Sequence, residues 1–294
     1  MNDYTFTSGE ELLAICQEHQ IPISEAAILA ELSREEMDRD GIMGEMRTDL
    51  EVMRESIRVG LEEQQISITG LMGEDADKLM AFTDSAVMGQ EMTRIVASAM
   101  AVTEVNASMG RIVAAPTAGA SGILPAVLIQ YGDAHDLSED QLIAGLCNAG
   151  AIGLIIARNA SLAGASGGCQ AETGSAAAMA ASALTELRGG TPQMCLHAAA
   201  IALKNVMGLV CDPVAGLVEC PCIKRNAIGA ANAVLCSDMI MAGIESIIPF
   251  DEVVTAMRNV GRMMHPDLRE TARGGLAATP TAQRIAEKIR NFEG

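Results

Sequence analysis

The run AETGSAAAMAASALTEL, from Ala171 to Leu187, decides the fold class. Alanine, leucine and methionine are strong helix formers, and the run shows no alternation of apolar and polar residues. Gly189-Gly190 ends this predicted helix. Thr191-Pro192 begins the next one, because proline is favoured at the first position of a helix.

The composition extends this prediction to the whole chain. Of the 294 residues, 49% are hydrophobic but only 2% are aromatic, and there is no tryptophan. The core must therefore consist of Ala, Leu, Ile, Val and the 19 Met, which favours closely packed helices. We expect an all-α fold, a compact multi-helix catalytic domain with an N-terminal helical segment.

Capping residues and apolar spacing predict further helices on both sides of the Ala-rich run. They are expected after Ser8 to about His19, after Ser24, from the Ser33–Glu36 capping box to about residue 62, at Asp84–Met109, from Ser138 to Arg158, at about Arg225–Ala242, after Pro249 and at about Thr281–Arg290. We divide the chain into an acidic helical segment, residues 1–62, which we interpret as amphipathic and solvated, and a cysteine-bearing domain, residues 63–294.

Charge and cysteine content exclude several classes of function. The net charge of −18 argues against binding to nucleic acid or to anionic membranes, which requires basic patches. Met1 to Glu11 lacks the features of a signal peptide, and we interpret Leu142–Ala157 as a buried core helix. We therefore expect a cytoplasmic protein, in which eight cysteines are metal ligands or core residues rather than disulfides.

Three cysteines lie beside residues that bend the backbone. Cys169 follows two glycines, Cys211 precedes Asp-Pro and Cys222 follows a proline. Cysteines on turns that converge can hold an iron–sulfur cluster, and three ligands would leave one iron open. The alternative is that they are ordinary buried thiols, and Cys220 is a rival to Cys222 as a ligand. The remaining four lie in apolar helical contexts and are assigned to packing: Cys16, Cys147, Cys195 and Cys236.

Two further stretches are candidates for substrate binding. Pro116–Gly122 is a loop of small residues before a helix, which suits a carboxylate or phosphate, although a tight packing turn has the same composition. Arg225 and Asn226 follow Cys222, where a guanidinium would neutralise a cluster, hold a substrate carboxylate or simply lie on the surface. The candidate substrate-binding residues are Thr117, Gly119, Ala120, Ser121, Gly122, Arg225 and Asn226.

Four motifs in order resemble the alpha chain of the iron–sulfur-dependent L-serine dehydratases. They are Asn106–Gly119 (NASMGRIVAAPTAG), Gly168–Glu172 (GCQAE), Cys211–Gly216 (CDPVAG) and Pro221–Ala227 (PCIKRNA), and the similarity continues through Arg269–Ala277 (RETARGGLA). The resemblance implies a helical catalytic domain that holds a [4Fe–4S] cluster through Cys169, Cys211 and Cys222. It also implies deamination of L-serine to pyruvate and ammonia, with the Thr117–Gly122 loop in the substrate pocket.

The chain differs from single-chain members of that family, which carry a further domain before the helical part and in some cases a C-terminal cysteine. The resemblance therefore implies a separate beta chain as partner. The open iron would act as a Lewis acid on the serine hydroxyl. No residue is identified as the catalytic base. The alternatives are an iron–sulfur L-cysteine desulfidase and a non-enzymatic cysteine-rich subunit, for example one that binds zinc.

Overall fold

The computed structural model describes residues 4–34 and 36–292, and it confirms the all-α prediction for this part of the chain. The described residues form no strand, and their only bridge of the β type is an isolated pair, Cys211 and Arg269. The α-helices are α1 (Gly9–His19), α2 (Ile23–Leu32), α3 (Arg39–Glu62), α4 (Asp75–Ala81), α5 (Gln90–Ala107), α6 (Ile123–Ala134), α7 (Glu139–Asn159), α8 (Gly164–Gly167), α9 (Ser175–Leu187), α10 (Pro192–Asn205), α11 (Cys222–Met241), α12 (Phe250–Met263) and α13 (Pro280–Phe292).

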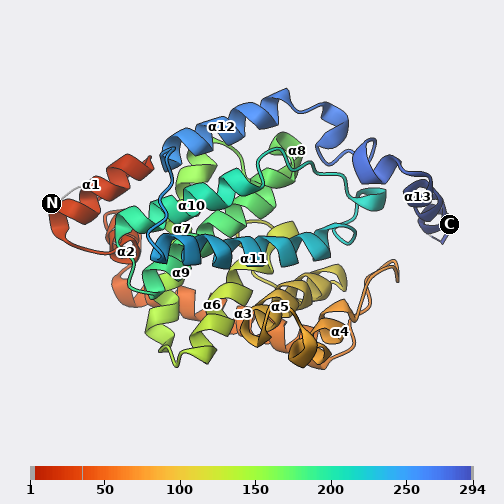
Figure 1. Cartoon of the computed structure of the whole chain (residues 1–294), viewed down its shortest axis with the longest axis horizontal. Coiled ribbons are helices and arrows are strands. Elements are labelled where there is room, and N and C mark those ends of the chain that lie inside the picture. The colour runs from red at the N-terminus through yellow and green to blue at the C-terminus, as the bar shows by residue number, and fades with distance from the viewer. Residues whose placement is uncertain (1–3, 35, 293–294) are drawn as a thin grey trace.

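The Ala-rich helix α9 lies at the centre of the fold, in contact with α6, α7, α10 and α11 (Figure 1). Residues 175–185 are all buried. Their small side chains let the neighbouring helices approach closely. Gly153 of α7 also has to be small, because a Cβ atom there would lie 3.1 Å from Met179 Sδ of α9. The composition that predicted helices therefore also sets how closely they pack.

Helix α7 is the only helix among the described residues that is long and apolar enough to cross a membrane. In the fold, 67% of its most apolar window is buried, and its fully buried residues include Leu142, Ile152 and Ile156. The Ser138 hydroxyl accepts a hydrogen bond from Gln141 N (3.3 Å), which completes the expected capping box. The burial agrees with the prediction of a core helix.

Three predicted helix starts are wrong, each because another residue caps the helix. Ser24 does not cap α2, which begins at Ile23 after Pro22; its backbone N–H donates to Glu186 instead. Helix α3 begins at Arg39 with Asp38 as its cap (Gly41 N to Asp38 Oδ1, 2.9 Å), not at the Ser33–Glu36 box, of which residue 35 lies outside the described residues. Helix α5 begins at Gln90 rather than Asp84, because Gly89 has a φ of 79°.

The N-terminal helices join the main core. Leu12, Ile23 and Leu50 are buried in the same apolar cluster as α7 and α9. The opposite face of α3 is charged, and there Arg58 pairs with Glu55 and Glu62. Helix α3 is thus amphipathic and ends at Glu62 as predicted, whereas the division into domains at residue 62 stays a prediction.

Candidate active site

Cys169 lies on a turn that is fixed to the Cys211 loop. It follows Gly168, whose φ is 77°, and precedes the π-helical turn Gln170–Gly174. Gln170 N donates to Leu209 O (3.0 Å), and the Gln170 side-chain oxygen accepts from Gly208 N (2.9 Å). A single glutamine therefore ties two segments together that are distant in sequence.

Cys211 is held by the chain that follows α12. Its N–H donates to Leu268 O (2.9 Å), and its carbonyl accepts from Glu270 N (2.7 Å). The next residue, Asp212, accepts from Arg225 Nη2 (2.8 Å) and from Leu276 N (2.6 Å). These bonds bring the Arg269–Ala277 stretch, distant in sequence, against the cysteine loop.

Cys222 is the first residue of α11 and is partly buried, as is Cys220. Burial raises the pKa of the Cys211 thiol most. Neighbouring charges, among them those of Cys169 and Cys222, raise it further. Burial and then Cys169 raise the pKa of the Cys222 thiol to about 12. The hydrogen bonds join the segments that carry the three predicted ligands: Gln170 ties the Cys169 turn to the Cys211 loop, and Arg225 of α11 donates to Val210 O of the same loop. Cys220 is not among the groups that shift Cys169 or Cys211.

The backbone of Gly164 lies close to Cys211 and Glu172. A Cβ atom on Gly164 would lie 2.9 Å from Cys211 Sγ and 2.7 Å from Glu172 Oε2. In residues 4–34 and 36–292, no three His, Cys, Asp or Glu side chains are placed to bind one metal ion directly. Cys169, Cys211 and Cys222 are free cysteines, and each offers a sulfur atom as a ligand. The donor set therefore fits an iron–sulfur cluster, whose ligands are thiolates.

Glu172 lies between the cysteines and the Thr117–Gly122 loop, and sequence reasoning did not single it out as a site residue. The Cys211 thiol is 3.8 Å from Glu172 Oε2, and a Cβ atom on Gly119 would lie 3.4 Å from Glu172 Oε1. Burial raises the pKa of this carboxyl group, and the Thr117 hydroxyl lowers it. The sequence signal that could have found it is its place in the Gly168–Glu172 motif, and in the structure it lies in a π-helical turn, a feature that recurs at functional sites.

The predicted substrate loop is joined to the cysteine site by Asn226. The buried Asn226 side chain accepts from Gly122 N (3.0 Å) and donates to Gly119 O (2.8 Å) and Cys222 O (3.0 Å). The loop and the start of α11 are thus a single hydrogen-bonded unit. Asn226 holds the loop in place.

The residues of the loop divide into two groups. Ala120, Ser121 and Gly122 face the protein interior: Ser121 Oγ donates to Ala118 O (2.8 Å), and a Cβ atom on Gly122 would lie 2.0 Å from Ala99 O. The backbone N–H groups of Ala118 and Gly119, by contrast, make no hydrogen bond within the described residues. Thr117 Oγ1 is buried and also has no hydrogen-bond partner there. Gly119 does not have a positive φ, so its small size matters rather than its backbone freedom.

Arg225 is partly buried and its guanidinium is already engaged. Nη1 donates to Val210 O (2.8 Å), and Nη2 pairs with Asp212. Its positive charge lowers the pKa of both Cys169 and Cys222. Of the three roles considered from the sequence, this geometry favours neutralising the thiolates and positioning the Cys211 loop.

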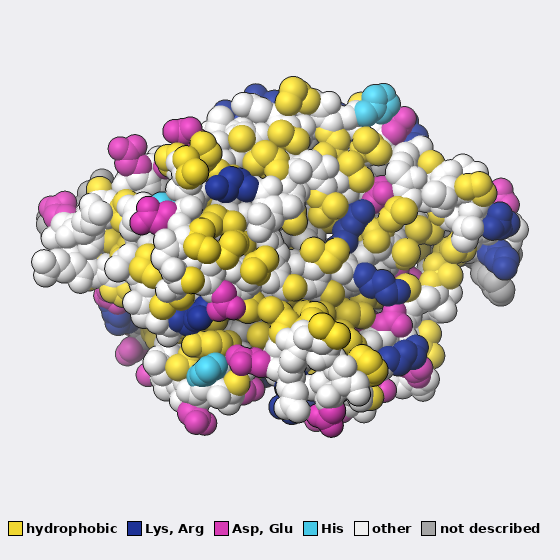
Figure 2. Space-filling model, in the orientation of Figure 1, with side chains coloured by type: hydrophobic (Ala, Val, Ile, Leu, Met, Phe, Trp, Pro, Cys, Tyr) yellow, Lys and Arg dark blue, Asp and Glu magenta, His cyan; other side chains and the backbone are white. Residues whose placement is uncertain are grey.

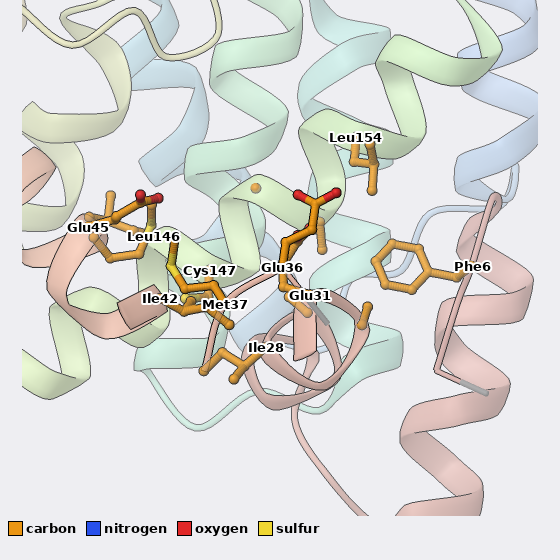
Figure 3. Close-up of a pocket in the computed structure, with 15 residues that line it drawn as sticks. Phe6, Ile28, Glu31, Glu36, Met37, Ile42, Glu45, Leu146, Cys147 and Leu154 are labelled. Carbon is orange, nitrogen blue, oxygen red and sulfur yellow. The ribbon is translucent and has the colours of Figure 1, made fainter. Parts of the chain in front are cut away.

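A hollow with largely apolar walls lies elsewhere in the molecule and holds none of these residues. It has a volume of about 400 Å³ and lies between α2, α3 and α7. Figure 3 shows Phe6, Ile28, Leu154 and Cys147 around it, with Glu36 and Glu45 also on its wall. This hollow contains a single cysteine, Cys147, and none of the candidate site residues predicted from the sequence.

Residues 18–277 match the family model described as serine dehydratase alpha chain. The chain belongs to this family. It is 48% identical over 286 residues to the probable L-serine dehydratase, alpha chain, of Bacillus subtilis, covering 97% of this chain and 95% of the relative. It is 41% identical over 280 residues to the L-serine dehydratase, alpha chain, of Peptoniphilus asaccharolyticus, covering 95% and 96%.

A longer relative, the L-serine dehydratase of Streptomyces coelicolor, is 41% identical over 281 residues. That alignment covers 93% of this chain but only 61% of the relative. The chain therefore corresponds to nearly the whole of the separate alpha chains and to about three-fifths of the longer enzyme.

Proposed function

We propose that this chain is the alpha subunit of an L-serine dehydratase, which converts L-serine to pyruvate and ammonia with a [4Fe–4S] cluster and a beta chain. The observation that supports the proposal is a set of hydrogen bonds from Gln170, Arg225 and Asn226, which link the segments of Cys169, Cys211 and Cys222 with one another and with the Thr117–Gly122 loop. The relatives named as L-serine dehydratases support the substrate.

Cys169, Cys211 and Cys222 would hold the cluster, and Arg225 would offset part of its negative charge. When bound, a cluster with one iron free of protein thiolate supplies a Lewis acid for a poor leaving group such as the serine hydroxyl. All three thiols have raised pKa values because of burial, so the free thiols stay protonated at neutral pH. Assembly of the cluster would release these protons.

The remaining groups match the two charges of serine. The carboxylate fits the N–H groups of Ala118 and Gly119 and the unpaired Thr117 hydroxyl, since backbone N–H groups before a helix suit an anion. The Glu172 carboxylate, on the other side of Gly119, is placed to accept hydrogen bonds from the substrate ammonium. This arrangement leaves the hydroxyl directed toward the cysteines.

The bonds that change are confined to two carbon atoms. The Cα–H bond and the Cβ–O bond break, a Cα–Cβ double bond forms, and the elements of water leave. The resulting aminoacrylate tautomerises to an imine, which water hydrolyses to pyruvate and ammonia. The chain's own residues bind and orient serine for this step.

A beta chain would cover the open side of the site. Apolar side chains near the cysteines are exposed on two segments, with Ile68 (70%) on the loop bonded to Ala107 and Met109 (77%) after α5. Leu217, between Cys211 and Cys222, is also exposed. The name alpha chain in the relatives supports a partner of this kind.

The proposal is tested by anaerobic purification of the chain with and without a candidate beta chain. Iron, sulfide and zinc are counted, and pyruvate is measured from L-serine and from L-cysteine. We expect iron with equal sulfide, and pyruvate from serine when both chains are present. Preference for L-cysteine would favour the desulfidase, and zinc without sulfide would favour the non-enzymatic subunit.

A further inference from the structure

Helix α11 carries an unpartnered apolar face along its length. One side of the helix packs on α5, α9 and α10. On the other side, Ile228 is 58% exposed and Leu235 is 52% exposed. Ala231 lies between them at the helical spacing of three and four residues, so the three share one face. Figure 2 shows apolar side chains gathered across the middle of the molecular face on which Figure 1 places α11.

This face has one charged residue at each end, and the two have opposite sign. Lys224 lies at the N-terminal end, where its side chain is 62% exposed and pairs with Asp75 (3.2 Å). Asp238 lies at the C-terminal end, where its side chain is 61% exposed and pairs with Arg188 (2.8 Å). Both lie seven residues from Ala231, so they are on the same stripe of the helix.

We propose that α11 is the centre of a symmetric contact with a second copy of this chain, in which the two α11 helices lie antiparallel. A two-fold axis at Ala231 places Lys224 opposite Asp238 of the second copy, Ile228 opposite its Val234 and Leu235 opposite its Ala227. Isologous contacts require a patch that is complementary to itself in this way. The small Ala231 at the axis lets the two backbones approach closely.

The charges would form an alternating row rather than isolated pairs. Each Lys224 would lie between Asp75 of its own chain and Asp238 of the other, and each Asp238 between Arg188 and the other Lys224. The existing intrachain pairs therefore hold both side chains in place and need not be broken. Because of the two-fold axis, the contact would contain two such rows of charges, one at each end.

A pair of helices is too small for a stable dimer, which buries about 1,200–2,000 Å² in total. The flanks of α11 provide additional surface. Met241, Ile244 and Ile248, at and just beyond its C-terminal end, are 37%, 52% and 43% exposed. Exposed apolar side chains therefore recur from Ile228 to the start of α12, with the charged Asp238 and Glu245 among them.

Sedimentation velocity on the full chain, over a range of concentrations, tests the proposal. The 30.7-kDa chain should sediment as a dimer. Leu235→Glu should raise the dissociation constant by about 100-fold or more, because each substitution counts twice across the axis. Met263→Glu is the matched control, since Met263 on α12 is 78% exposed and away from α11, and it should leave the dimer unchanged.

A charge exchange identifies the antiparallel register. Lys224→Glu and Asp238→Lys should each weaken the dimer by about 2- to 30-fold, the range for two exposed ion pairs, and the double variant should regain most of the loss. A monomeric wild-type chain, a dimer unaffected by Leu235→Glu, or a double variant weaker than both singles would overturn the proposal. The proposal would also be overturned if Leu235→Glu lost binding to the beta chain but kept the dimer. That result would assign this face to the beta chain.

Discussion

Two partly buried carboxylates, Glu172 and Glu186, each raise the pKa of three cysteines, and they differ in how fully they are hydrogen-bonded. Glu186 accepts hydrogen bonds from Ser24 N (3.3 Å) and Asn148 Nδ2 (2.8 Å), and Ser182 completes the network through Asn148. Glu172 has weaker partners: the Cys211 thiol lies 3.8 Å from its Oε2, and the Thr117 hydroxyl is near enough to lower its pKa. Burial raises the pKa of both carboxyl groups, so burial alone does not distinguish a functional group from a structural one.

The cysteines near the two carboxylates differ in where they lie in the fold. Cys16, Cys147 and Cys195 lie within the regular helices α1, α7 and α10, where they fill the core, as expected. Cys169 and Cys211 lie on loops, and Cys222 is the first residue of its helix. A cation lies near a cysteine in both groups, because Arg225 opposes the effect of burial on the pKa of Cys169 and Cys222, and Arg39 does the same for Cys147. The position of the thiols, on loops and at a helix start rather than within helices, therefore distinguishes the two groups, and their number does not.

The largest effect is expected from the cysteines of the site. Cys169→Ala, Cys211→Ala and Cys222→Ala should each nearly abolish iron binding and activity, because each removes a thiolate ligand. Cys147→Ala and Cys236→Ala, both buried in the core, are the controls and should keep the iron. Anaerobic iron and sulfide analysis measures the difference. If Cys220→Ala loses the cluster and Cys222→Ala keeps it, the assignment of Cys222 is wrong.

The two carboxylates should respond differently to substitution. Glu172→Gln should raise KM for serine by about 10- to 100-fold, the equivalent of one charge-assisted hydrogen bond, with iron content unchanged. Glu186→Ala should instead lower the free energy of unfolding by about 1–3 kcal/mol, because it leaves Ser24 N and Asn148 without their acceptor. Kinetics and urea unfolding on both variants check this. Equal KM values for wild type and Glu172→Gln would remove Glu172 from the site.

Gly119→Val is expected to raise KM by about 10-fold, because the side chain would occupy the space between the loop and Glu172. Thr117→Ala should have a milder effect, since it removes only a hydroxyl. Serine kinetics, visible absorbance of the cluster and thermal unfolding are measured on the same preparation. A packing turn predicts instead that stability and cluster fall together with activity.

A third carboxylate, Glu104, provides the pH test. It is 2% exposed, and burial raises its pKa from 4.5 to about 7, although it accepts a hydrogen bond from Asp75 N (2.9 Å). Because the folded state binds the proton more tightly, its contribution to stability is full below pH 4.5 and is lost as the pH rises to about 7. The free energy of unfolding of Glu104→Gln should therefore exceed that of wild type by up to about 3 kcal/mol at pH 8, and by little at pH 4.5. An equal difference at both pH values would contradict this.

Much of the fold follows from local sequence. The Ala-rich run became α9, Thr191-Pro192 begins α10, and the Ser138 capping box begins α7, because these signals act over a few residues. The wrong starts at Ser24 and Asp84 have causes outside the signal: a distant Glu186 takes the Ser24 N–H, and Gly89 interrupts the predicted helix.

The site was predictable only in part for the same reason. Cys169, Cys211 and Cys222 share a property visible in the sequence, a neighbouring Gly or Pro that bends the backbone. The links that bring them together are long-range: Gln170 to Gly208, Asp212 to Leu276 and Asn226 to Gly119. No local pattern encodes these pairs, and Glu172 becomes recognisable only when they are formed.

The central claim is that three cysteines hold a [4Fe–4S] cluster with one iron free to meet the substrate. Mössbauer spectroscopy of the anaerobic enzyme, before and after addition of L-serine, tests it most directly. The account predicts that the signal of one iron in four changes on addition of serine while the other three stay the same. A spectrum in which all irons are equivalent and unaffected by serine would contradict it.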